Sequence, residues 1–256
     1  MAETKGITRR DLFRFAAAGG VTTAVGLNLG EGGPRIAAAD TSTPDGALKA
    51  LLDGNDRFLA RNMTSLTEDQ ILISAGVPES HQPFAAILSC ADARLSPEIV
   101  FDQVMGDLFI TRVAGNIATS EIIASLEYAV FALNIRLIMV LGHGACGAVF
   151  HADRRTPVAG TQISGLYAPI RPALNIAGTA ATTDAKSQLN ARIQAILLQD
   201  SSRLIADRIL GVTSPPLKVV AAYYNLVPGL QGPPPGAENG RVTLLSIPGI
   251  TPAATP

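Results

Sequence analysis

Apolar and polar positions along the first half of the chain alternate between helical spacing and short, continuously apolar runs. Helical spacing indicates helices, and short apolar runs bounded by Pro, Gly or Asn indicate buried strands. The pattern predicts, in order, helices over 45–63 and 67–76, a strand over 84–90, a short helix over 97–105, a strand over 107–113, a helix over 120–133 and a strand over 137–141. Alternation of this kind implies a parallel sheet with right-handed crossovers, and therefore an α/β fold.

The second half of the chain continues this alternation less clearly. We expect a loop over 153–165, a long helical stretch over 187–210, and strands over 217–226 and 241–247. Pro and Gly are frequent over 228–240, between the last two strands. A connection of this length suggests either a decorated hairpin or a passage to an edge strand.

The first forty residues differ from the remainder. The basic pair Arg9-Arg10 is followed by an apolar, small-residue run over 15–29 and then by Ala37-Ala38-Ala39. This order is typical of a secretory signal, and the paired arginines resemble a twin-arginine signal. The alternative is a membrane anchor, but the run is shorter than the roughly 20 residues that a span needs. We therefore predict a signal peptide over 1–39, a single domain over 40–256, a periplasmic, cell-envelope or extracellular location, and no stable membrane anchor.

Composition excludes several classes of protein. Of the 256 residues, 47% are hydrophobic and 16% are charged, and the formal net charge is −1. Disordered chains combine low hydrophobicity with high net charge, and nucleic-acid-binding proteins usually carry a basic field. Neither class fits, so we expect no nucleic-acid partner. Two cysteines are also too few for a disulfide framework.

Both cysteines and one histidine lie at or just beyond the ends of predicted strands. Cys90 closes the first strand, while His143 and Cys146 follow the third. The carboxyl ends of parallel strands meet at one edge of a sheet, so these side chains can converge. Two thiolates and one imidazole are three zinc ligands, and three protein ligands with an open position are typical of a catalytic zinc site.

Asp92 and Arg94 follow Cys90 closely enough to lie beside such a metal ion. The carboxylate could accept a hydrogen bond from a zinc-bound water or bind the zinc itself. The guanidinium could hold that carboxylate through a bidentate pair. Alternatively, the two residues would form an ordinary surface ion pair.

Other interpretations of these residues remain open. Cys90 and Cys146 could form a single disulfide in an oxidising compartment, or they could be buried, inert thiols. The His-x-x-Cys spacing and the strand-end positions favour the metal site. His81 and His151 are expected to be surface or satisfied core residues, and Tyr223 and Tyr224 to be simple strand residues.

At these residues the sequence resembles the β-class carbonic anhydrases. That family carries Cys-x-Asp-x-Arg in one loop and His-x-x-Cys about fifty residues later. The matching segments here are Cys90-Ala-Asp92-Ala-Arg94 and His143-Gly-Ala-Cys146. Further similarity extends from about Ala47 to Ile247, and includes Gly54-Asn55-Asp56-Arg57-Phe58, Arg112-Val-Ala-Gly115-Asn116, Ser125-Leu-Glu-Tyr-Ala129 and the segment 220–229.

The resemblance implies a sheet of four parallel strands and one antiparallel strand, flanked by helices, in a homodimer that could pair into a tetramer. It implies one Zn²⁺ per chain, held by Cys90, His143 and Cys146, with Asp92 and Arg94 as the catalytic dyad. The implied reaction is the reversible hydration of CO₂ to bicarbonate and a proton by zinc-bound hydroxide, the activity of a carbonate dehydratase (a zinc lyase). Some members close the site at lower pH with the Asp as fourth ligand, which would here be Asp92.

Two rival functions share these sequence features. A related enzyme could hydrolyse carbonyl sulfide or carbon disulfide at the same kind of metal site. A secreted binding protein could instead keep the fold without the chemistry, with no metal and a bond between Cys90 and Cys146.

Overall fold

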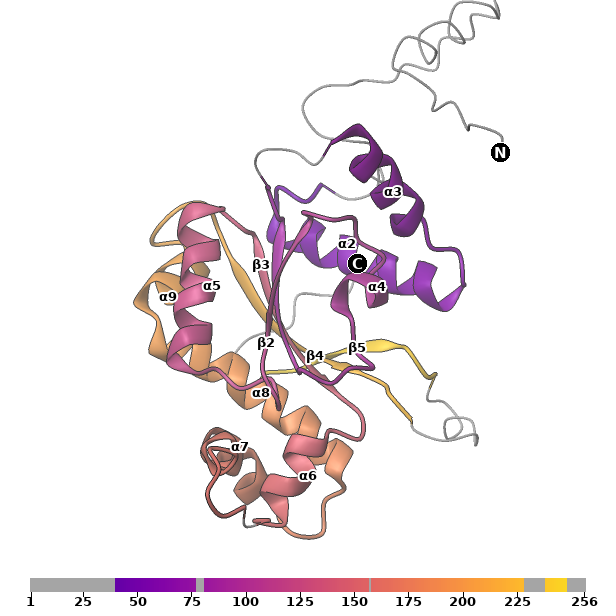
Figure 1. Ribbon diagram of the computed structural model, residues 1–256. Helices are drawn as coiled ribbons and strands as arrows, with labels where there is room; N and C mark the ends of the chain where they lie inside the picture. Colours follow the sequence, from indigo (N-terminus) through magenta and orange to yellow (C-terminus); the bar gives the residue numbers. More distant parts are fainter. Residues whose placement is uncertain (1–39, 77–80, 157, 228–237, 248–256) are drawn as a thin grey trace, which may run out of the picture. The chain divides into compact units, whose positions relative to one another are not determined.

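The computed structural model describes residues 40–76, 81–156, 158–227 and 238–247 (Figure 1). The predicted signal over 1–39 lies outside the described residues, as does most of the predicted Pro/Gly-rich loop. The helices of the described part have the bounds α2 Pro44–Leu59, α3 Ser65–Ala75, α4 Pro97–Val100, α5 Ser120–Ala132, α6 Gly147–Asp153, α7 Ser164–Ala177, α8 Thr183–Ser201 and α9 Arg203–Ile209. None of them is long and apolar enough to cross a membrane.

A five-stranded sheet forms the centre of the fold, with the order β2-β1-β3-β4-β5. Its strands are β1 Ala85–Ser89, β2 Leu108–Arg112, β3 Leu137–His143, β4 Lys218–Tyr224 and β5 Val242–Leu245. The first four pair in parallel, and β5 pairs antiparallel with β4 at the edge. The predicted α/β class, with four parallel strands and one antiparallel strand, is therefore confirmed.

Helices cover both faces of the sheet (Figure 1). Successive residues of a strand point to opposite faces, so the sheet contributes to two cores. One core packs β1, β3 and β4 against α5, α8 and α9, with the buried residues Ala86, Leu88, Leu126, Val130, Ile138, Val140, Ala195, Leu198 and Ile205. The other packs the opposite face against α2 and α4, with Leu48, Leu51, Ile87, Val100, Phe101, Met139 and Leu141. Burial on both faces explains why the inner strands read as continuous apolar runs.

The structure differs from the sequence predictions mainly in helices of the second half. The loop expected over 153–165 corresponds to the connection between α6 and α7, and overlaps each helix by one or two residues. The helices α6 and α7 themselves were not predicted. Pro169 and Pro172 lie inside α7, and proline normally argues against a helix interior. The predicted long helix over 187–210 is two helices, because Ser202 is extended between them and its hydroxyl accepts a hydrogen bond from the amide of Ile205.

The short helix α4 ends before Asp102, whose buried carboxylate joins three segments. Asp102 has a positive φ of 45°. One carboxylate oxygen lies 2.6 Å from Nε of Arg57, and the backbone amides of Thr64 and Ser65 donate to the other at 3.0 Å. Burial alone would raise the pKa of Asp102, but these donors outweigh it and lower the pKa below its usual value. The ionised carboxylate therefore stabilises the junction of α2, α3 and α4.

We expect Asp102→Asn to lower the free energy of unfolding at pH 7 by about 2 to 3 kcal/mol, since Arg57 is left partly buried without its counterion. A carboxylate with a lowered folded-state pKa stabilises the protein above the unfolded-state pKa of about 4, and this contribution is lost as the pH falls through the folded-state value. Urea unfolding at pH 7 and at successively lower pH should therefore show the difference between wild type and variant shrinking with acid. Asp53→Asn, which breaks a surface pair with the exposed Lys49, should change stability by less than about 0.5 kcal/mol. Equal effects of the two substitutions would contradict this assignment.

Candidate metal centre

Three buried side chains meet at the carboxyl edge of the parallel strands. Cys90 directly follows β1, His143 is the last residue of β3, and Cys146 is the N-cap of α6. One ligand atom from each, two sulfurs and one ring nitrogen, all lie within 4.8 Å of one another. Both cysteines are free thiols. The structure thus brings together the three residues that the sequence singled out, although β1 and the His143–Cys146 segment are far apart along the chain.

The histidine is prepared to act as a ligand. Its Nδ1 lies 2.8 Å from the carbonyl oxygen of Gly144. A carbonyl only accepts hydrogen bonds, so Nδ1 carries the proton and Nε2 is left with its lone pair. His143 is fully buried, and its Nε2 has no hydrogen-bond partner in the described part of the chain. An orphaned imidazole nitrogen beside two thiols fits a zinc ion with Cys₂His coordination.

The two thiols influence each other's protonation. A hydrogen bond from Cys146 lowers the pKa of Cys90, which also receives the backbone amide of Gly115 at 3.3 Å. The same pairing raises the pKa of Cys146. One sulfur of the pair is therefore disposed to be a thiolate, the form that binds metal.

Asp92 and Arg94 form a bidentate ion pair at the rim of this centre. Nε and one terminal nitrogen of Arg94 lie 2.9 and 2.7 Å from the two carboxylate oxygens of Asp92. The Arg94 side chain is the first cause of a pKa for Asp92 well below its usual value. Asp92 is not a member of the three-residue group. Its carboxylate is thus ionised and committed to Arg94, and the closed arrangement with Asp92 as fourth ligand stays a prediction.

Arg112, at the end of β2, fixes the loop that carries Cys90 and Asp92. Its Nε donates to the carbonyl of Cys90 at 3.0 Å, and a terminal nitrogen donates to the carbonyl of Asp92 at 2.7 Å. The sequence places Arg112 in a segment of the resemblance but indicates no role for it, because backbone acceptors leave no signature in a sequence.

Asp184, in the first turn of α8, fixes the other ligand loop. Its carboxylate accepts the backbone amide of Ala145 at 2.9 Å. Ala145 has a positive φ of 50°, a conformation that a non-glycine residue adopts only when its surroundings hold it. A side chain at Gly144 would collide with the backbone of Leu226. The turn between His143 and Cys146 is therefore held by a residue that the sequence analysis missed.

The other two histidines contribute no ligand atom to the centre, whereas the two tyrosines lie beside it, since Tyr224 pairs with His143 across β3 and β4. His81 is exposed, and His151 is exposed with its Nδ1 3.3 Å from the hydroxyl of Thr156. Tyr223 and Tyr224 are strand residues of β4, as predicted. The Tyr223 hydroxyl is buried, and burial and the nearby Asp184 carboxylate raise its pKa.

We expect Asp184→Ala to weaken metal affinity about 10- to 100-fold, the usual cost of losing a residue that supports a ligand from behind. Asp184→Asn should recover most of this loss, because the amide oxygen can still accept from Ala145. Zinc affinity measured by competition with a chelator tests the prediction. Asp200→Ala, on an exposed residue at the other end of α8, is the matched control. Unchanged affinity in Asp184→Ala would refute the positioning role.

Comparison with known protein families shows which family this chain belongs to. Residues 85–230 match the family model described as carbonic anhydrase, and the chain therefore belongs to the carbonic anhydrase family. Carbonic anhydrase 2 of Mycobacterium tuberculosis is 44% identical over 108 residues, which cover 42% of this chain and 52% of the relative. The carbonic anhydrase of Mycolicibacterium smegmatis is 43% identical over 108 residues with the same coverage. The chain thus matches about half the length of these curated relatives.

Solved structures agree on the fold. The β-carbonic anhydrase of Coccomyxa, solved in complex with acetazolamide, superposes with a TM-score of 0.55 at 24% identity, covering 77% of this chain and 86% of that one. The Aspergillus fumigatus β-carbonic anhydrase CafA gives 0.56 at 20% identity, with coverage of 78% and 90%. The chain therefore has the fold of the β-carbonic anhydrases.

Proposed function

We propose that the protein is a zinc-dependent carbonic anhydrase that catalyses the reversible hydration of CO₂ to bicarbonate and a proton. The observation that carries this proposal is the group of Cys90, His143 and Cys146, placed beside the Asp92–Arg94 pair on a chain of this family. A zinc ion bound there supplies a Lewis acid that activates water for attack on carbon.

Some residues of the site would hold the metal ion, and others would orient the water. Cys90, Cys146 and Nε2 of His143 would hold the metal, and the Gly144 carbonyl fixes the imidazole tautomer. The Asp92 carboxylate would accept a hydrogen bond from the water and so orient it. Arg94 keeps that carboxylate ionised and in place, since it binds both oxygens.

The position of the dyad also suits the release of a proton. The three ligands are buried, whereas the side chains of Asp92 and Arg94 are 17% and 46% exposed. The dyad therefore lies between the metal centre and solvent. Bicarbonate and a proton can leave on this side without disturbing the buried ligands.

Zinc content and CO₂ hydration of the purified protein, measured by stopped flow between about pH 6.5 and 9, test the proposal. We expect about one zinc per chain and hydration that chelation abolishes and zinc restores. Parallel assays with carbonyl sulfide and carbon disulfide are the comparison. Fast sulfide release with negligible CO₂ turnover would replace the proposed substrate. A metal-free protein with a Cys90–Cys146 disulfide would indicate the binding protein instead.

We propose that the chain forms a homodimer, which could pair into a tetramer. Large exposed apolar side chains support it: Tyr128 and Phe131, three residues apart on α5, are 54% and 73% exposed, and Ile99 of α4 and Met105 after it are 45% and 50% exposed. Exposed apolar patches commonly mark protein–protein contacts. Sedimentation velocity of the wild type and of Phe131→Glu tests the proposal. A monomeric wild type would overturn it.

Export through a twin-arginine signal over 1–39, leaving a domain over 40–256, is a further part of the proposal. It rests on Arg9-Arg10, the apolar run that follows, and the alanines at 37–39. We expect the full chain expressed in a bacterium with this pathway to reach the periplasm, and Arg9→Lys/Arg10→Lys to stay inside. Equal distribution of the two proteins would reject the signal.

A further inference from the structure

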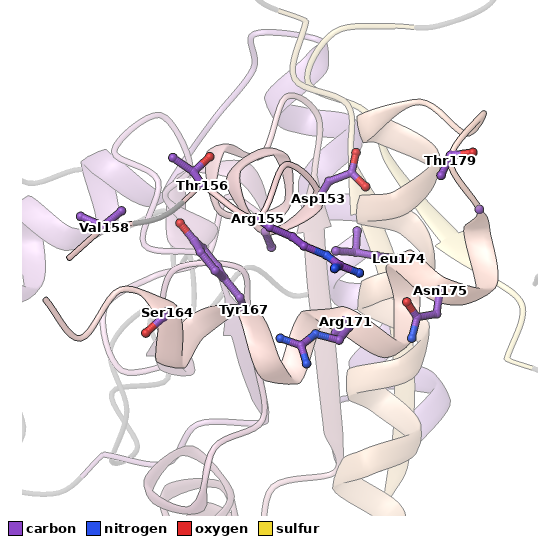
Figure 2. A pocket seen from close by; sticks show the side chains of 12 residues that line it. Asp153, Arg155, Thr156, Val158, Ser164, Tyr167, Arg171, Leu174, Asn175 and Thr179 are labelled. Atoms are coloured by element: carbon purple, nitrogen blue, oxygen red, sulfur yellow. The ribbon is translucent and has the colours of Figure 1, made fainter.

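A cavity of about 580 Å³ lies between α6 and α7, away from the Asp92–Arg94 pair (Figure 2). Its walls come from the end of α6, the residues after it, and one side of α7. Figure 2 shows the side chains of Arg155 and Arg171 reaching into this space, with Tyr167, Leu174 and Asn175 around them. The volume falls in the range of pockets that hold small organic molecules, and it exceeds what bicarbonate would fill.

The charges of the cavity do not cancel. Within the described part of the chain, neither Arg155 nor Arg171 has a side-chain hydrogen bond or an ion pair. The carboxylate that lines the cavity, Asp153, is bound at 2.7 Å by Lys186, whose side chain is only 3% exposed. Arg154, by contrast, is engaged outside the cavity, over the ring of Phe150. Two guanidinium groups are thus left to face the cavity without a counterion.

The other lining groups indicate an organic anion. The hydroxyls of Ser164 and Tyr167 and the amide of Asn175 can donate hydrogen bonds, while Leu174 and Val158 offer apolar surface. Guanidinium groups match carboxylate and phosphate oxygens through paired, planar hydrogen bonds. We propose that the cavity is a second binding site, for a small organic dianion such as a phosphate monoester or a dicarboxylate.

The site is distinct from the metal centre but packs against it. α6 begins directly after Cys146 and ends at Asp153 on the cavity wall. A single apolar cluster contains Cys90 and Cys146 together with Ala152, and Tyr167 and Leu174 pack on it. An added anion can also bind a metal ion directly, so the experiment must separate the two locations.

Isothermal titration of the zinc-loaded full chain with glycerol 3-phosphate, inorganic phosphate and succinate tests the proposal, with glycerol as the neutral control. We expect saturable binding of at least one dianion and none of glycerol. R155Q and R171Q should each weaken this binding about tenfold or more, because each removes charge-assisted hydrogen bonds. Zinc content should stay at the wild-type level in both variants. Preference for glycerol 3-phosphate over succinate would identify a phosphate monoester, and the reverse a dicarboxylate.

The matched control is R203Q, because Arg203 is 93% exposed and pairs only weakly with Asp207 at 3.4 Å. It removes the same charge elsewhere on the surface and should leave the affinity unchanged. The proposal would be overturned if no dianion bound. Equal binding by wild type, R155Q and R171Q would also overturn it, because the anion would then lie at the metal centre. So would a loss of affinity in R203Q as large as that in the two cavity variants.

Discussion

His143→Ala should abolish zinc binding and reduce CO₂ hydration to the uncatalysed rate. Nε2 of this residue is the one neutral ligand atom of the group, and it is buried with no hydrogen-bond partner in the described chain. Its removal leaves two thiols, which are too few for a stable zinc site. The loss of affinity should therefore exceed the 10- to 100-fold expected for a supporting residue such as Asp184.

Cys90→Ser should have the same outcome by a different route, because a serine hydroxyl is neither deprotonated nor soft enough to replace a thiolate. Zinc content by mass spectrometry and hydration by stopped flow measure both variants. Thermal unfolding adds a second readout, since saturating zinc should raise the wild-type Tm and leave the variants unmoved. His151→Ala, on an exposed histidine outside the group, should behave as wild type. One zinc per chain in His143→Ala would remove His143 from the ligand set.

The sheet and the ligand group could be predicted because both depend on short-range patterns. Strands buried on both faces give apolar runs such as 137–141, and parallel strands place their carboxyl ends together. That rule predicts from the sequence that Cys90 and His143 lie close together. In the structure Ser89 pairs with Leu141, so the residues that follow β1 lie beside the last residues of β3.

The residues that hold the ligand loops in place could not be predicted, because their partners are backbone atoms far away in the sequence. Asp184 binds the amide of Ala145, and Arg112 binds the carbonyls of Cys90 and Asp92. Every residue has such backbone groups, so no residue type marks the partner in advance. Helix α7 was missed for another reason, since its two prolines contradict helical propensity and tertiary packing of Ile170 and Ala173 outweighs them. The cavity lined by Arg155 and Arg171 lies between α7 and the end of α6, and neither of these helices was predicted.

Asp92→Asn should keep about one zinc per chain and lower turnover about 100- to 1000-fold, the range expected when a group that handles a proton is lost. The substitution preserves shape but removes the negative charge, so Arg94 loses its ionic partner and the proposed acceptor for the attacking water is weakened. Retained metal is the distinguishing feature, because Asp92 lies outside the three-residue group. Asp53→Asn removes a partly exposed carboxylate elsewhere and should leave turnover unchanged.

A double-mutant cycle decides whether Asp92 and Arg94 act as one unit. If Arg94 serves only to hold Asp92, then Arg94→Gln and the double variant should lose about as much turnover as Asp92→Asn alone, because effects within one unit are not additive. Multiplied losses would instead give Arg94 a separate contact with substrate. Full activity of Asp92→Asn would refute the orienting role of its carboxylate, and loss of zinc would make Asp92 a ligand in the resting protein.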